Sequence, residues 1–216
     1  MAEILKDLEQ LSERSDEVDI RKEANEFRDK IVELKSIIRE NNLVALAAPQ
    51  IGYFKRIFCI NFKGDIKTFI NPIITNVKGL TVDREKCDSI PGKEFLRVRH
   101  PSIDVVYQTP LGKIMSQKLV GLAAFTFQEQ LDHLDGLLLS DVGLELDENW
   151  DKATEEEKDQ ILGMYLDSLD IKRKVVDKEI SESKELTQIK EAADFMEKVQ
   201  KGEVKLSSME IEVDKK

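Results

Sequence analysis

The stretch that decides the fold of this chain runs from residue 128 to residue 136 and reads QEQLDHLDG. It closes an apolar segment, residues 120–134, whose Leu, Ala and Phe content predicts a helix, and Gly136 fits just past the helix end. Side chains four positions apart share one face of a helix, so Glu129 and His133 could bind one cation together. Taken alone, a Glu and a His at this spacing are more often a solvated pair on a helix surface.

Two further stretches carry residues with chemical potential. Residues 43–52 read LVALAAPQIG, and residues 85–92 read EKCDSIPG. Cys87 sits among polar residues, a setting that suits a metal ligand or a reactive thiol. Cys59 instead lies in an apolar run and is expected to be a buried thiol in a strand. A disulfide between them is not expected, because the chain shows no secretory signal.

Together, the three stretches resemble the motifs of the peptide deformylase family in order and in chemistry. The family motifs are GxGLAAPQIG, EGCLSxPG and QHExDHLxG, and the corresponding stretches begin here at residues 43, 85 and 128. The resemblance covers the middle of the chain and the helix before it. It implies an α+β fold in which antiparallel sheets surround the helix that carries the third motif.

The resemblance also implies a metal site. In the family, the Cys of the second motif and two His of the third hold a ferrous or similar divalent ion. Cys87 and His133 keep two of these positions, and Glu129 replaces the first His. The implied ligands are therefore Cys87, Glu129 and His133, with iron, zinc or nickel as the candidate ion. Gln50 keeps the position that steadies the oxyanion, and Gln130 replaces the catalytic Glu.

Both replacements affect the expected chemistry. A thiolate and two neutral imidazoles leave a divalent ion with net positive charge, which a carboxylate at Glu129 would cancel. We therefore expect metal binding to be weakened or absent, although a change of metal could compensate in part. The Gln130 amide cannot exchange protons, and general acid–base catalysis contributes a factor of roughly 10² to 10⁴. Asp132 belongs to the family pattern and is expected to be a structural hydrogen-bonding partner.

The substrate-binding candidates implied by the resemblance are Ala45, Leu46 and Asp88. Leu43 and Ala45 replace two glycines of the first motif, and these side chains should crowd the peptide-binding wall. Asp88 replaces a Leu and would place a carboxylate beside the amide that stabilises a developing negative charge. The alternative for each position is a shifted loop.

The rest of the chain predicts an N-terminal helix, a strand-rich middle and a helical tail. Apolar residues at three- and four-residue intervals predict a helix over about residues 19–40, after a short amphipathic segment. Short apolar runs between turn residues predict strands at residues 56–62, 68–70, 73–77, 103–107 and 111–119. Beyond Gly143 the sequence is acidic and lysine-rich, with apolar stripes over residues 162–180 and 186–199. We therefore predict a core domain, 1–143, and a helical C-terminal extension, 144–216.

Composition narrows the possible partners. The formal net charge is −10, with 41% hydrophobic and 35% charged residues, which favours a globular protein and gives no basic surface for nucleic acid or an anionic membrane. No apolar run approaches the roughly 20 residues needed to span a bilayer, and no signal-like stretch follows the start. We expect a cytoplasmic protein with neither nucleic acid nor membrane as a partner.

Two hypotheses of function follow. The first is a divergent peptide deformylase, acting on the formylated N-termini of nascent peptides with reduced or lost activity. The second is an inactive binding or assembly module that uses its core for peptides and its C-terminal helices for a protein partner or self-association. A third, a hydrolase of another amide, would need a base that the sequence does not provide. A bacterium, an organelle or a bacteriophage would each suit such a chain.

Overall fold

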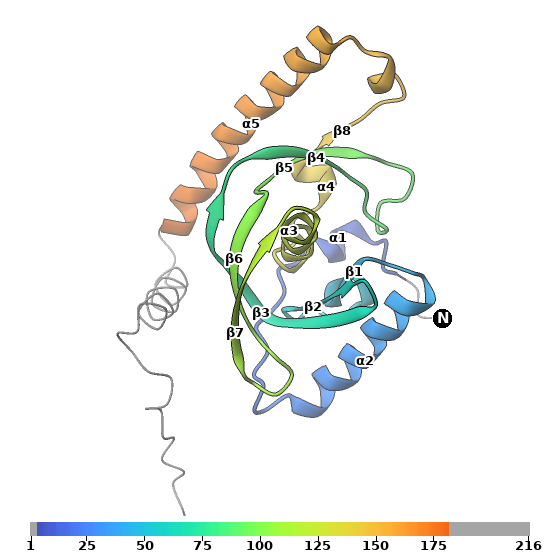
Figure 1. Cartoon of the computed structure of the whole chain (residues 1–216), viewed down its shortest axis with the longest axis vertical. Coiled ribbons are helices and arrows are strands. Elements are labelled where there is room, and N and C mark those ends of the chain that lie inside the picture. Colours follow the sequence, from blue (N-terminus) through green and yellow to red (C-terminus); the bar gives the residue numbers. More distant parts are fainter. Residues whose placement is uncertain (1–3, 182–216) are drawn as a thin grey trace, which may run out of the picture. The chain divides into compact units, whose positions relative to one another are not determined.

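The protein, seen here in a computed structural model, is described over residues 4–181, and its side-chain surroundings over residues 4–169. The chain divides into two units, residues 1–160 and 161–216. Figure 1 shows the arrangement of helices and strands in the first unit. Within the described residues, no helix is both long enough and apolar enough to cross a membrane.

The larger sheet of the core has five antiparallel strands in the order β1-β2-β3-β6-β7. The short strand β1 lies at one edge of the sheet and β7 lies at the other. The strands are β1 (Ala45–Ala47), β2 (Ile57–Phe62), β3 (Asp65–Lys78), β6 (Ser102–Gln108) and β7 (Ile114–Val120).

Helix α2 (Ala24–Glu40) covers one face of this sheet. Its residues Phe27, Ile31 and Leu34 recur on one side of the helix and are buried in a cluster with Ile57 and Cys59 of β2. The predicted buried position of Cys59 is thereby confirmed. The preceding segment contains the short helix α1 (Leu8–Leu11), whose first turn is capped by the side chain of Asp7.

Helix α3 (Leu122–Leu134) covers the opposite face. Phe58 faces α3 although its neighbours Ile57 and Cys59 face α2, because successive strand residues point to opposite faces. Phe127 of α3 makes edge-on contacts with Phe58 and Phe69 at centroid distances of 5.0 and 5.4 Å. Burying one such side chain fully contributes about 1.5–3 kcal/mol, so this aromatic cluster anchors α3.

A smaller sheet completes the core. It has three antiparallel strands in the order β4-β5-β8, namely β4 (Thr81–Glu85), β5 (Phe95–Arg99) and β8 (Leu144–Glu145). In Figure 1, α3 lies between this sheet and the larger one, and α4 (Leu139–Val142) lies close to β4 and β8. The predicted α+β fold, with antiparallel sheets around the third-motif helix, is confirmed.

The structure differs from the sequence-based prediction in the middle of the chain. The two strands predicted on either side of Asn71 form one strand, β3, with a register shift between Ile70 and Ile73. Asn71 has a φ of 47° and exchanges two hydrogen bonds with the backbone of Val18, which holds the irregular residue in place. The prediction also began α2 too early and did not identify β1, β4, β5 or β8.

The C-terminal part begins with the short helix η2 (Trp150–Lys152) and the long helix α5 (Glu155–Ser181). The first predicted tail helix, residues 162–180, lies within α5 and is confirmed. The second, residues 186–199, lies outside the described residues. The predicted domain boundary after residue 143 falls between α4 and β8, and the role of the extension remains a proposal.

Candidate metal centre

Three potential ligand atoms, one each from Cys87, Glu129 and His133, lie within 4.8 Å of one another. The Cys87 Sγ atom and the His133 Nε2 atom are 3.3 Å apart. Two ligands of one tetrahedral ion lie roughly 3.3–3.8 Å apart when the metal bonds are about 2.0–2.3 Å long. The separation of Cys87 and His133 falls in this range, and the thiol, carboxylate and imidazole lie close enough together that they could hold one divalent ion. The structure brings the three predicted residues together, and their role as ligands stays a prediction.

Helix α3 and the turn after β4 position these side chains. Glu129 and His133 lie one helical turn apart on α3, and Cys87 follows β4 in a turn closed by a bond from Ile90 N–H to the Cys87 carbonyl. The short helix η1 (Ala48–Ile51) brings in Gln50 from the first motif. Cys87 and His133 are both buried, as metal ligands in a dry site would be.

Burial shifts the protonation of all three side chains. It raises the pKa of Cys87 to about 11 and that of Glu129 to about 8, and it lowers the pKa of His133 to about 4. The charges of Glu85 and Asp132 raise the pKa of Glu129 further, whereas Arg99 lowers it. Near neutral pH the uncharged forms are favoured, so a divalent ion must displace protons from Cys87 and Glu129 in order to bind.

The two glutamines of the site have different surroundings. Gln50 Oε1 accepts a bond from Ala47 N–H at 2.9 Å, and Gln50 Nε2 donates to Ser89 Oγ at 3.4 Å. Gln50 therefore joins the first motif to the second. Gln130 is buried, and its Oε1 atom has no hydrogen-bond partner among the described residues. The buried Nδ1 atom of His133 also has no hydrogen-bond partner among residues 4–169.

The substrate-binding candidates come from two separate parts of the chain, β1 and the turn after β4. Ala45 and Leu46 belong to β1, an edge strand. Asn61 N–H donates to the Val44 carbonyl, so the alternation of an antiparallel pair turns the Ala45 N–H and C=O groups away from β2. The Leu46 side chain is fully buried beneath α2 and can contribute only its backbone.

Asp88 is exposed and lines a cavity of about 570 Å³ next to Cys87. The walls of this cavity come from residues 84–94 and from residues 146–151. Asp88 therefore borders the same cavity as the predicted ligand Cys87, and its role in substrate binding stays a prediction.

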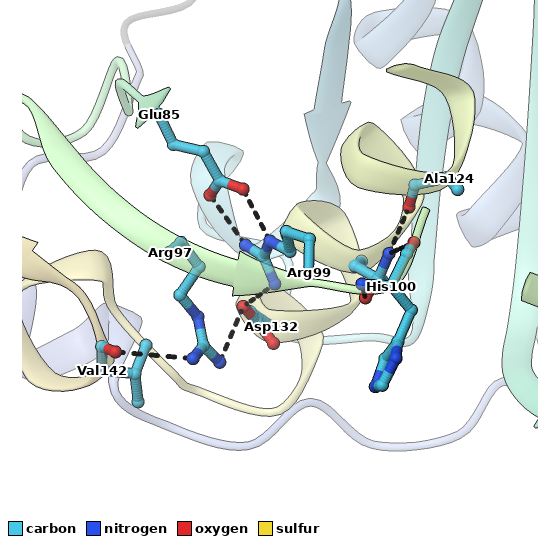
Figure 2. A network of polar contacts seen from close by, with 8 residues as sticks. Glu85, Arg97, Arg99, His100, Ala124, Asp132 and Val142 are labelled. Atoms are coloured by element: carbon cyan, nitrogen blue, oxygen red, sulfur yellow. Dashed lines mark hydrogen bonds and ion pairs between the residues drawn. The ribbon is translucent and has the colours of Figure 1, made fainter. Parts of the chain in front are cut away.

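A buried ionic network beside the site was not predicted from the sequence. Arg99 is 2% exposed and makes a two-pronged pair with Glu85, with Nε–Oε1 and Nη2–Oε2 distances of 2.6 and 2.7 Å. Its Nη1 atom donates to Asp132 Oδ2 at 2.6 Å, which confirms Asp132 as a hydrogen-bonding partner. Figure 2 shows these contacts together with Arg97. The available signal was the alternation of Arg97 and Arg99 along an otherwise apolar run.

The core is of the α+β class, with a helix between two antiparallel sheets. Cys, Glu and His side chains meet at this helix, a combination that could hold a divalent ion in a buried site. Comparison with known proteins makes the assignment specific. The sequence model of the family described as polypeptide deformylase matches residues 1–148. The chain therefore belongs to the polypeptide deformylase family.

Individual relatives agree with this assignment. The peptide deformylase of Dictyoglomus turgidum is 36% identical over 119 residues, which are 52% of this chain and 78% of that protein. The crystal structure of peptide deformylase from Thermotoga maritima has a TM-score of 0.60 at 30% identity and covers 65% of this chain and 95% of that one. A Synechococcus elongatus peptide deformylase, solved in complex with actinonin, has a TM-score of 0.60 at 28% identity and covers 68% of this chain and 79% of that one.

Proposed function

We propose that this chain is a divergent deformylase-like protein that holds a divalent ion at Cys87, Glu129 and His133 and recognises formylated peptide N-termini, with hydrolysis reduced or lost. The observation that carries the proposal is the buried Gln130 amide, at the position that the sequence resemblance gives to the catalytic Glu. The unpartnered Oε1 atom of Gln130 leaves one acceptor in the site for a ligand group.

Peptide recognition would begin at the outer edge of β1. The outward N–H and C=O groups of Ala45 can pair with an extended peptide main chain, which is how strand addition to a sheet edge gives affinity. Gln50 Nε2 carries two hydrogens, and the bond to Ser89 uses one of them. The other can donate to the formyl oxygen as negative charge develops on it. A bound divalent ion would add Lewis acidity at the formyl carbonyl.

Hydrolysis of the formyl group needs a residue that moves a proton. An attacking water must lose a proton, and the departing amine must gain one. Gln130 Oε1 can accept a hydrogen bond from the water but cannot take its proton, because a neutral amide is not a base at physiological pH. When a divalent ion displaces its proton, Glu129 would add a negative charge where the family has a neutral His. Both changes favour binding without efficient turnover.

The second candidate function is a binding or assembly module without hydrolysis. It is supported by α5, on which Ile161, Met164 and Leu166 are 40%, 68% and 42% exposed. Apolar side chains exposed along one helix suit a contact with a protein partner or with a second copy of the chain. In this reading the core would still bind peptides through Ala45 and Gln50.

The test is to restore both altered residues. We expect the wild-type chain to release formate from a formyl-Met peptide slowly or not at all, and the double variant Glu129→His/Gln130→Glu to gain roughly 10²- to 10⁴-fold. The gain is expected because the first change returns positive charge to the site and the second returns a base. Formate release with added Fe²⁺, Ni²⁺ or Zn²⁺ measures it.

The matched control is Glu129→His/Gln130→Leu, which restores the imidazole without a base and should stay inactive. Each single change should also fall well short of the double variant. Rapid hydrolysis by the wild-type chain, abolished by a chelator and recovered with metal, would contradict the proposal. Peptide binding by the wild-type chain with no activity in the double variant would favour the second candidate.

A further inference from the structure

The potential ligands come from two parts of the core that are packed separately. Helix α3, with Glu129 and His133, is anchored in the apolar cluster of the five-stranded sheet through Phe127 and Leu134. Cys87 belongs to a different apolar cluster, which also contains Ile90, Phe95 and Leu139. Apolar packing therefore places the two parts in different clusters, and a strong polar contact that joins them would help to set their spacing.

Arg99 makes that contact. It binds Glu85, which lies two residues before Cys87, and Asp132, which lies one residue before His133. Figure 2 shows the Arg99 guanidinium between the two carboxylates, one from β4 and one from α3. Its planar fork holds Glu85 through two parallel bonds, a geometry that fixes direction as well as distance. The chain segments before Cys87 and before His133 are thus tied to one buried cation.

We propose that Arg99 is a positioning residue that sets the distance between Cys87 and the ligand face of α3. The network is buried, so removing the cation leaves the carboxylates of Glu85 and Asp132 near each other without a compensating positive charge. The two segments would then separate, and Cys87 would leave its place beside His133. The metal-binding arm of the test rests on the proposed function, whereas the geometric claim does not.

The contacts of Arg97 and Gln128 lie near those of Arg99 but join other segments, so they provide controls. Arg97 reaches Asp132 only at 3.7 Å and otherwise donates to the Val142 carbonyl, so it does not join β4 to α3. Gln128 ties α3 to the backbone of His100 through one bond at 3.0 Å and one at 2.9 Å. That tie involves the segment after β5 and does not involve the segment that carries Cys87.

The first experiment measures the geometry without any metal. The full chain is treated with chelator and then with iodoacetamide, and the alkylation of each cysteine is followed by mass spectrometry. Cys59 is fully buried in the α2 cluster and serves as an internal reference for global unfolding. We expect Arg99→Met to speed the alkylation of Cys87 by roughly tenfold or more, with Cys59 unchanged. Arg97→Met should leave both rates close to those of the wild-type chain.

The second experiment measures metal binding by titration with Co²⁺, whose thiolate charge-transfer absorption reports a bond to Cys87. Arg99→Met should weaken Co²⁺ binding by roughly 10- to 100-fold, the range found when groups that orient ligands are removed. Arg99→Lys keeps the charge but loses the planar fork, so its affinity should fall between those of Arg99→Met and the wild-type chain. Arg97→Met should bind Co²⁺ nearly as the wild-type chain does.

If alkylation of both cysteines rises in Arg99→Met, Asp132→Asn and Glu85→Gln test the same tie with smaller changes. Each should expose Cys87 and leave Cys59 protected. Wild-type alkylation rates at Cys87 in Asp132→Asn, Glu85→Gln and Arg99→Lys would overturn the proposal. If the wild-type chain binds neither Co²⁺ nor formyl peptides, the proposed function fails, and the alkylation experiment still decides the role of Arg99.

Discussion

At the scale of single residues, the hydroxyl of Tyr53 is a buried polar group outside the site. It is buried with no hydrogen-bond partner among the described residues, and the residue is 8% exposed. Burial, with the nearby charges of Glu26 and Glu23, raises the pKa of Tyr53 from 10.0 to about 12. The folded chain therefore holds this hydroxyl protonated at a pH where the unfolded chain releases its proton.

We predict that Tyr53→Phe is at least as stable as the wild-type chain at neutral pH, because it removes an unsatisfied group that costs about 1–3 kcal/mol. As the pH rises from 10.0 towards about 12, Tyr53 ionises in the unfolded chain but not in the folded chain, and this stabilises the unfolded state. The free energy of unfolding of the wild-type chain therefore falls over this range, whereas Tyr53→Phe has no such group to ionise. The stability difference should widen over that range. Urea unfolding of both proteins at several pH values measures it, and a difference that narrows would refute the prediction.

The sequence predicted some contacts of the candidate site and missed others, for a physical reason. Glu129 and His133 could be paired because helical geometry makes positions four apart neighbours. Arg99 could not be paired, because its partners Glu85 and Asp132 lie 14 and 33 residues away in sequence. Only the pairing of β4 with β5 and the packing of α3 bring them together. Ionic contacts between residues far apart in the sequence produce no local pattern from which they could be predicted.

At the scale of elements, the end of α3 depends on Gly136. The Leu137 N–H donates to the Asp132 carbonyl and the Gly136 N–H to the His133 carbonyl, the two bonds of a Schellman motif. Gly136 has a φ of +70°, and an added Cβ would lie 2.3 Å from the Ser12 carbonyl oxygen. The glycine thus permits both the left-handed turn and the close approach of the α1 segment.

We predict that Gly136→Ala lowers the free energy of unfolding by at least about 2 kcal/mol, because the strained φ and the backbone collision add together. Gly64→Ala is the control, since Gly64 also has a positive φ but has no atom within 4 Å of an added Cβ. It should show the smaller loss caused by φ alone. Urea denaturation measures both variants, and equal losses would show that the contact with Ser12 has no energetic importance.

Helices and strands could be predicted where the local sequence pattern was strong. The prediction failed where contacts between distant residues determine the course of the backbone. The apolar spacing of α2, and the Leu, Ala and Phe content of α3, were sufficient to identify both helices. At Asn71 the Asn-Pro dipeptide predicts a turn, yet the strand continues. The Asn71 side chain bonds to Val18 and to Gln108, so the turn-forming residue is absorbed into the sheet as a bulge. A residue 53 positions away in sequence supplies one of these partners.

At the scale of the whole chain, the three apolar clusters of the described part are built between residue 4 and residue 139. Two clusters lie on opposite faces of the five-stranded sheet, and the third supports the three-stranded sheet. Among the potential metal ligands, Cys87 belongs to the third cluster, and Glu129 and His133 lie on α3, whose residues Phe127 and Leu134 belong to the second. The site therefore depends on both sheets, whereas none of the cluster members comes from the part of α5 whose side chains the structure describes, residues 155–169.

This arrangement leads to a prediction about the C-terminal extension. A chain ending at Ala153 retains β8, η2 and the ion pair between Arg84 and Asp151, and it loses α5 with everything that follows. No cluster member is lost, and Tyr165 is the one residue of α5 that is buried within residues 155–169, so we expect cooperative unfolding with a free energy within about 3 kcal/mol of the full chain, the scale of burying one large side chain. Urea denaturation followed by circular dichroism measures this.

If the exposed apolar residues of α5 form a contact between copies, sedimentation equilibrium should show association of the full chain and a monomer for the shortened one. A shortened chain that fails to fold would show that the extension is needed for core stability, and the assembly role proposed for α5 would lose its support.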